Sequence, residues 1–183
     1  ADLPITMTAA SSGGTWSGTG INSASTGSFG STSLAANTYT ITYSTQGNCS
    51  LPYTTTVVVN ANVDATISAV ADLCNDAPAI NLTAVDAGGT WSGQGVSATG
   101  TFTPNSVTPN TYTITYTIGG ACPDSDTQDI VVLTVPDGTI TPAGPFCQDA
   151  LPQTLTAAST GGVWSGTGIT GAANGTFGAS NTP

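Results

Sequence analysis

The hexapeptide Gly-Gly-Thr-Trp-Ser-Gly stands at residues 13–18 and again at residues 88–93, and residues 161–166 repeat it with one change, as Gly-Gly-Val-Trp-Ser-Gly. Its tryptophans are Trp16, Trp91 and Trp164, so the motif returns at nearly equal intervals. A second phrase, Thr-Tyr-Thr-Ile-Thr-Tyr, stands at residues 38–43 and returns at residues 111–116, after nearly the same interval. A fixed period of this length indicates a tandem array of small domains, each a copy of one supersecondary unit.

The composition narrows the classes of partner. The 183 residues include no Lys, Arg or His, and the ten acidic residues, all aspartate, give a net charge of −10. Without cations to displace counterions from phosphate, no nucleic-acid binding is expected, and anionic membrane surfaces are excluded for the same reason. No apolar run is long enough for membrane insertion. The hydrophobic share of 38% is nevertheless sufficient to build folded cores.

The middle copy predicts a series of short strands separated by turns. Residues 111–118 alternate Tyr and Ile with Thr, so one face of this strand is expected to be buried and the other wet. Further strands are predicted at residues 66–70, 80–84, around Trp91, at 101–103 and at 128–135, with a turn at 74–78. We therefore expect an all-β fold of tandem immunoglobulin-like β-sandwich repeats of about 75 residues.

Aromatic residues mark the expected cores. A tryptophan on the third strand and a tyrosine near the start of the sixth are typical of immunoglobulin-like sandwiches, where the tyrosine hydroxyl caps a loop. Tryptophan faces can also bind sugars, but their identical position in every copy favours the core. The predicted core residues are Trp16, Trp91, Trp164, Tyr39 and Tyr112. Leu82 and Ile114 occupy the positions of the disulfide that such sandwiches usually carry.

The period divides the chain into three predicted domains. Residues 1–60 form a repeat whose first strand is missing, residues 61–135 form a complete repeat, and residues 136–183 form a repeat truncated before its last two strands. Short linkers are expected near residues 60–62 and 136–138. Because both ends fall inside a repeat, we expect the chain to be about two and a half repeats of a longer protein.

The whole pattern resembles a known group of repeats. It runs from Cys74 and Asp76 through Leu-Thr-Ala, Gly-Gly-Thr-Trp-Ser-Gly, Gly-Thr-Phe and Thr-Tyr-Thr-Ile-Thr-Tyr to Gly-Gly-Ala-Cys, ending at Cys122. It is similar to the Ig-like repeats of giant Bacteroidetes surface proteins, which include gliding-motility adhesins and other cargo of the type IX secretion route. The resemblance covers the whole chain and implies an extracellular, filament-like or stalk-like adhesin at the cell surface. It implies no particular ligand.

The four cysteines also follow the period. Cys49 and Cys122 are separated by one period, as are Cys74 and Cys147. Two cysteines per repeat in a secreted array predict disulfides. Pairing Cys74 with Cys122 inside one repeat would close a loop of about 48 residues and contribute about 4 kcal/mol. However, the second and sixth strands of such a sandwich run parallel, which places these two residues at opposite poles. The alternative is a bond between neighbouring repeats.

Metal binding and catalysis have little support. Asp124, Asp126 and Asp129 alternate in the predicted hairpin after Cys122, and alternating carboxylates can bind calcium. Residues 50–54, their counterparts in the first copy, contain no aspartate, which favours a solvated loop. No cofactor is expected. Without histidine, acid–base catalysis would have to rest on Asp or Tyr alone, so we expect no enzyme activity.

Two functions therefore remain. The first is a structural repeat region of an extracellular bacterial surface filament or adhesin stalk, whose partners are neighbouring repeats or identical chains. The alternative is a glycan- or surface-binding Ig-like module with a polysaccharide or surface ligand. Its loops would need exposed aromatic residues or paired acids in each copy.

Overall fold

The computed structural model describes residues 3–47 and 50–178. Within these ranges the chain is all-β, as predicted: short strands alternate with turns, and the one helical element is a 3-10 turn, η1 (Pro104–Ser106). Each sheet lies inside one of the three predicted repeat ranges. The domain boundaries themselves stay a prediction.

Residues 3–60 form two antiparallel sheets. One has the order β1 (Ile5–Thr6), β4 (Ser28–Phe29), β3 (Ile21–Ser23), and the other has the order β2 (Thr15–Ser17), β5 (Asn37–Ser44), β6 (Pro52–Val59). In the second sheet Tyr43 stands opposite Trp16 on β2 and opposite Tyr53 on β6. Trp16, Phe29, Ile41 and Tyr43 are buried together and make the core of this range.

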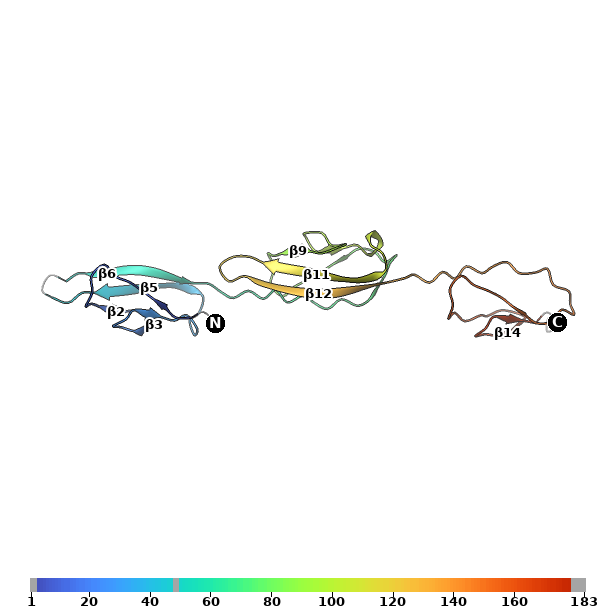
Figure 1. The fold of residues 1–183 in the computed structure, drawn as a ribbon, viewed down its shortest axis with the longest axis horizontal. Helices are drawn as coiled ribbons and strands as arrows, with labels where there is room; N and C mark the ends of the chain where they lie inside the picture. Colours follow the sequence, from blue (N-terminus) through green and yellow to red (C-terminus); the bar gives the residue numbers. More distant parts are fainter. Residues whose placement is uncertain (1–2, 48–49, 179–183) are drawn as a thin grey trace. The chain divides into compact units, whose positions relative to one another are not determined.

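Residues 61–135 form the complete sandwich. One sheet has the order β7 (Leu73–Cys74), β12 (Asp124–Leu133), β11 (Asn110–Ile118), β9 (Thr90–Ser92), and the long strands β11 and β12 run side by side (Figure 1). The other sheet pairs β10 (Thr101–Phe102) with β8 (Ile80–Asn81). Strand β7 runs parallel to the end of β12. An immunoglobulin-like sandwich has two such sheets facing each other.

Residues 136–178 form one three-stranded sheet with the order β13 (Gln153–Thr154), β15 (Thr176–Phe177), β14 (Ile169–Gly171). A separate bridge joins Ile140 to Ala157. The Ile67–Ala84 bridge in the middle range is its counterpart, one period earlier in the sequence. Each bridge attaches an extended segment to the residues that follow β8 or β13 in the sequence. The same local structure therefore recurs at the period of the sequence.

The predicted alternation on residues 111–118 is confirmed on β11. Tyr112, Ile114, Tyr116 and Ile118 are between 0% and 8% exposed, whereas the threonines between them are exposed or half-buried. Because successive side chains on a strand point to opposite faces, the Tyr and Ile face covers the core and the Thr face meets water.

Several predicted segments differ from the structure. The strand predicted at residues 66–70 is a single bridge from Ile67 to Ala84, and the strand predicted at 80–84 is limited to Ile80–Asn81. In two further segments the pairing reaches beyond the prediction. The strand predicted at residues 128–135 begins earlier, at Asp124, so the acidic stretch belongs to β12 and not to a hairpin loop. The turn predicted at residues 74–78 begins after a strand, because Cys74 pairs with Leu133 before Ala77 donates to the Cys74 carbonyl at 3.0 Å. In both cases pairing across the sheet extends the strand beyond what local composition indicates.

Candidate functional site

The recurring tryptophans pack against recurring tyrosines. Trp91 is 7% exposed, and its ring centroid lies 4.4 Å from that of Tyr116. Trp16 and Tyr43 repeat this contact at 4.6 Å. The rings are tilted toward each other, an arrangement that aromatic pairs favour. Trp16 and Trp91 are therefore packed within the cores of their repeats.

Gly89 of the hexapeptide and Gly100, seven residues beyond it, make room for this pair. The Tyr116 hydroxyl accepts the Gly89 N–H at 2.8 Å and donates to the Asp86 carbonyl at 3.0 Å. A Cβ on Gly89 would stand 2.6 Å from the Tyr116 ring, a separation that would force one of them to move. On the other side, a Cβ on Gly100, whose φ is +92°, would stand 2.6 Å from the Trp91 nitrogen. The motif is thus a packing unit.

The remaining predicted core residues lie as follows. The Tyr112 hydroxyl donates to the Thr108 carbonyl at 2.6 Å, and the Tyr39 hydroxyl donates to the Ala35 carbonyl at 2.8 Å. This is the loop-capping bond expected of the tyrosine near the start of the sixth strand. Tyr112 is buried, while Tyr39 is half-buried. Trp164 is also half-buried.

The aspartates considered for calcium bind backbone and side-chain donors of the protein. Asp124 Oδ2 accepts the Ala65 N–H, and Asp126 Oδ2 accepts the Ile67 N–H, both at 2.9 Å. Asp129 Oδ1 accepts the Thr113 hydroxyl at 2.6 Å. Asp124 and Asp126 therefore act as hydrogen-bond acceptors for an extended segment, residues 64–68, which lies 59 residues earlier in the chain.

Residues 64–68, which we call the inserted strand, are held on two sides. On one side Ser68 N–H donates to the Thr83 carbonyl at 2.9 Å, and Val85 N–H donates to the Thr66 carbonyl at 3.0 Å. The other side is the pair of aspartate bonds just described. Ala65 is 0% exposed and Ile67 is 6% exposed. The inserted strand thus fills a slot between residues 83–85 on one side and β12 on the other.

The first repeat has the walls of the same slot, and the counterpart of residues 64–68 would fall before residue 1. Tyr43 donates to the Ser11 carbonyl as Tyr116 donates to that of Asp86, which makes residues 8–11 the counterparts of residues 83–86. Between residues 8–11 and residues 53–55 of β6 lies an open groove of about 450 Å³. Trp16, Ile41 and Tyr43 line its floor. We call this the acceptor groove.

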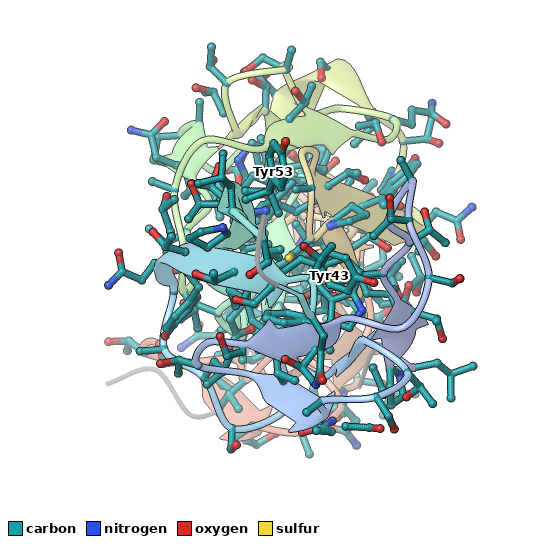
Figure 2. The ribbon with its side chains drawn as sticks, turned by 90° about the vertical axis from the view of Figure 1, so that its left-hand side faces the viewer. Tyr43 and Tyr53 are labelled. Atoms are coloured by element: carbon teal, nitrogen blue, oxygen red, sulfur yellow. The ribbon has the colours of Figure 1, made fainter. Side chains whose placement is uncertain are left out.

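Tyr53 stands on one wall of the acceptor groove, in the position that Asp126 takes in the middle repeat. It faces Tyr43 across the β5–β6 pair, and Figure 2 shows both side chains. Tyr43 is 8% exposed and Tyr53 is 70% exposed. None of the groove-lining residues is charged. The groove is therefore an uncharged, largely apolar slot shaped like the one that holds an extended strand elsewhere in the chain.

An aspartate begins each copy of the inserted strand. Asp64 Oδ1 accepts the Thr66 N–H at 2.9 Å, and Asp137 Oδ1 accepts the Thr139 N–H at 2.9 Å. Side-chain and backbone hydrogen bonds from these threonines hold the pKa of each carboxyl below its ordinary value. Sequence reasoning missed this feature, although the shared pattern Asp-x-Thr-Ile-Ser/Thr at residues 64–68 and 137–141 was a visible signal.

The predicted disulfide between Cys74 and Cys122 is not formed, and Cys74, Cys122 and Cys147 are free thiols. The parallel pairing of β7 places Cys74 beside Leu133, at the far end of β12, whereas Cys122 precedes the start of this strand. Ten residues of strand separate them by roughly 30 Å, against about 7 Å for the Cα atoms of a disulfide. Cys49 lies outside the described residues, and a bond between repeats stays a prediction.

Among residues 3–47 and 50–178, no three acidic, cysteine or histidine side chains gather in a way that would hold a metal ion. The same part of the chain contains no helix of the length and hydrophobicity that a membrane crossing requires.

The comparisons with known proteins identify no family. No protein-family model and no curated protein sequence matches the chain. Among solved structures, the chain is similar to the extracellular domain of protocadherin GammaB4, with a TM-score of 0.38 and 14% identity. This match covers 89% of the present chain and 39% of the protocadherin chain. A likeness at this level supports no inference about function.

Proposed function

We propose that this chain is a structural repeat region of an extracellular bacterial surface filament or adhesin stalk, located at the cell surface and without catalytic activity. One observation carries the proposal. The residues that recur at the period of the sequence, such as Trp91, Tyr116 and Gly89, pack against one another. Repetition has therefore kept the residues that fold the domain. This is what a spacer built from many copies requires.

The length of the strands supports an axial spacing. Strand β11 has nine residues and β12 has ten, which at a rise of about 3.4 Å per residue corresponds to roughly 31–34 Å of sheet. Domains joined end to end by short linkers would then advance the axis by about 30–40 Å per repeat. The acidic charge of −10 keeps such a chain soluble.

Electron microscopy of the native, full-length protein released from cells tests this proposal. We expect filaments with an axial repeat near about 30–40 Å, or a small multiple of it. A matched variant lacking residues 61–135 should shorten the filament by one such unit, because one complete predicted repeat is removed. Compact particles without an axial repeat, or an unchanged length in the deletion variant, would contradict a role as a spacer.

The glycan-binding alternative requires exposed aromatic residues or paired acids in each copy. The acids Asp124 and Asp126 have no aspartate counterpart in residues 50–54. Tyr53 is the exposed aromatic beside the acceptor groove, and its counterpart in the middle repeat is Asp126. An exposed ring is therefore not retained at this position. A glycan array probed with the 183-residue chain distinguishes the two functions, since a saturable signal that is lost in Tyr53→Ala would favour recognition of a sugar.

A further inference from the structure

The segment by which the chain enters the middle repeat runs beside the strand by which it leaves. At the start of β12, Asp124 accepts the N–H of Ala65 at 2.9 Å. At the end of β12, Leu73 of β7 stands opposite Val132, and the two strands run parallel. Both contacts join residues that lie 59 positions apart in the chain, as does the second aspartate bond described above. Residues 65–74, which we call the entry segment, therefore follow the whole of β12 in one parallel register.

The entry segment and β12 are also the places where a pull on the chain reaches the repeat. The chain arrives at Ala65 from the linker near residues 60–62 and leaves β12 at Leu133 toward residues 136–138. Ala65 is fastened to the start of β12, whereas the chain leaves from its end, ten residues or roughly 30 Å farther on. Tension along the chain therefore pulls the entry segment and β12 in opposite senses along their common direction.

This geometry loads the contacts in shear. When two parallel segments are pulled past each other, all the bonds between them carry the load together, so the segments separate only when several bonds break at once. At the far end of the entry segment the ladder continues, because the Asn75 N–H donates to the Leu133 carbonyl at 2.9 Å. The Asn75 side chain also donates to the carbonyls of Pro104 and Val107, at 3.0 and 2.6 Å.

The contacts at the start of β12 are of a strong kind. The acceptors are the carboxylates of Asp124 and Asp126, and hydrogen bonds to an ionised acceptor are stronger than those between neutral groups. The residues that donate are covered, since Ala65 is 0% exposed and Ile67 is 6% exposed. Water therefore has little access to replace these bonds when the segments are strained.

We propose that the middle repeat is a mechanical clamp, in which the entry segment and β12 together resist tension along the chain and Asp124 and Asp126 hold the inserted strand against β12. The inference rests on the proposed function, because a stalk or filament is what places tension on its repeats. A repeat that stays folded under load keeps the spacing of the stalk. The property that matters is the rate of unfolding under force, which equilibrium stability alone does not set.

Single-molecule force spectroscopy of the 183-residue chain, held by a peptide tag at each end under reducing conditions, tests the proposal. Unfolding of residues 61–135 releases about 75 residues, which at about 3.6 Å each, less roughly 34 Å of folded sheet, lengthens the tether by about 240 Å. This step identifies the middle repeat. In Asp124→Ala/Asp126→Ala it should occur at least about tenfold faster at the same force, because two charge-assisted bonds are lost. Asp124→Asn/Asp126→Asn keeps both acceptor oxygens and should retain most of the resistance.

Two controls separate the clamp from a general loss of stability. Asp129→Ala removes a carboxylate from the same strand, but its partner is the Thr113 hydroxyl of β11 at 2.6 Å, outside the entry segment, so the unfolding rate under force should not change. Ile114→Ala opens a cavity on β11 and leaves the entry segment and β12 unaltered. Hydrogen exchange should show a larger loss of stability in Ile114→Ala than in the aspartate pair, while the aspartate pair should unfold faster under force.

Either of two results would overturn the proposal. In the first, Asp124→Ala/Asp126→Ala unfolds under force no faster than Asp129→Ala. In the second, Ile114→Ala accelerates unfolding under force more than the aspartate pair does, so that resistance simply follows stability. Both are measured on the isolated chain, so they leave the spacer role standing, whereas compact particles in electron microscopy would contradict that role without altering the order of these variants under force.

Discussion

Removing one hydroxyl group should loosen the recurring aromatic unit without changing its shape. In Tyr116→Phe the ring stays, but the Gly89 N–H loses its acceptor and the Asp86 carbonyl loses its donor, at 2.8 and 3.0 Å respectively. Tyr116 is 3% exposed, while Gly89 and Asp86 are half-buried, so water can satisfy the two backbone groups only in part. We expect the local opening free energy to fall by about 1–2 kcal/mol.

Amide hydrogen exchange measured by NMR reports this change residue by residue in the intact chain. A loss of about 1–2 kcal/mol corresponds to exchange about 5–30 times faster at Gly89 and Trp91. Residue-specific exchange is preferable to a single unfolding midpoint, because a chain of several domains does not unfold in one step.

The first repeat supplies an internal replicate and a control. Tyr43 makes the same two bonds, accepting from Gly14 at 2.9 Å and donating to Ser11 at 2.6 Å, so Tyr43→Phe should accelerate exchange at Gly14 to a similar extent. Tyr53→Phe removes the hydroxyl of a side chain that is 70% exposed and should leave exchange unchanged. The reasoning is refuted if exchange at Gly89 in Tyr116→Phe stays as slow as in the unaltered chain.

Three further changes test other parts of the structure. Ile114→Ala empties a fully buried position and should destabilise its domain by about 2–5 kcal/mol; hydrogen exchange at the β11 amides measures this, and unchanged exchange would show that the site tolerates the cavity. Asp126→Ala removes the acceptor of the Ile67 N–H and should accelerate exchange at Ile67 about tenfold, whereas Asp126→Asn keeps an acceptor oxygen and should preserve most of the protection. The folded-state pKa of Asp64 is lowered, so the stability that its ionised carboxyl contributes is complete above about pH 4 and is lost as the pH falls through the lower folded-state pKa. Hydrogen exchange at Thr66 should therefore accelerate over this pH range in the unaltered chain, and this pH dependence should be absent in Asp64→Asn.

Much of the fold followed from patterns that are local in the sequence. The alternation of Tyr and Ile with Thr on residues 111–118 predicts a strand with one buried face, since side chains alternate across a strand whatever its partners are. The period of the hexapeptide predicts that the same unit recurs, and Trp16 and Trp91 make the same contact with their tyrosines. These features depend on a few neighbouring residues, so the sequence reveals them directly.

The role of the acidic stretch could not be read in this way. Asp124 and Asp126 stand in a pattern that also suits a calcium loop, and their acceptors meet the N–H groups of Ala65 and Ile67 only because the chain returns 59 residues later. The cysteines show the same limit. Spacing favours a bond between Cys74 and Cys122, while the expected sandwich topology places them at opposite poles. The parallel register of β7 with β12 decides between the two, because it separates these residues.

The sequence by itself therefore determined the period, the all-β class and the buried face of residues 111–118, because apolar patterning and turn residues act over short distances. Only the tertiary structure decided what the pairing of distant strands brings together. That pairing turned two aspartates into acceptors for the inserted strand and kept two cysteines apart. Strand register joins residues that are far apart in the chain, and no local pattern encodes which edges meet.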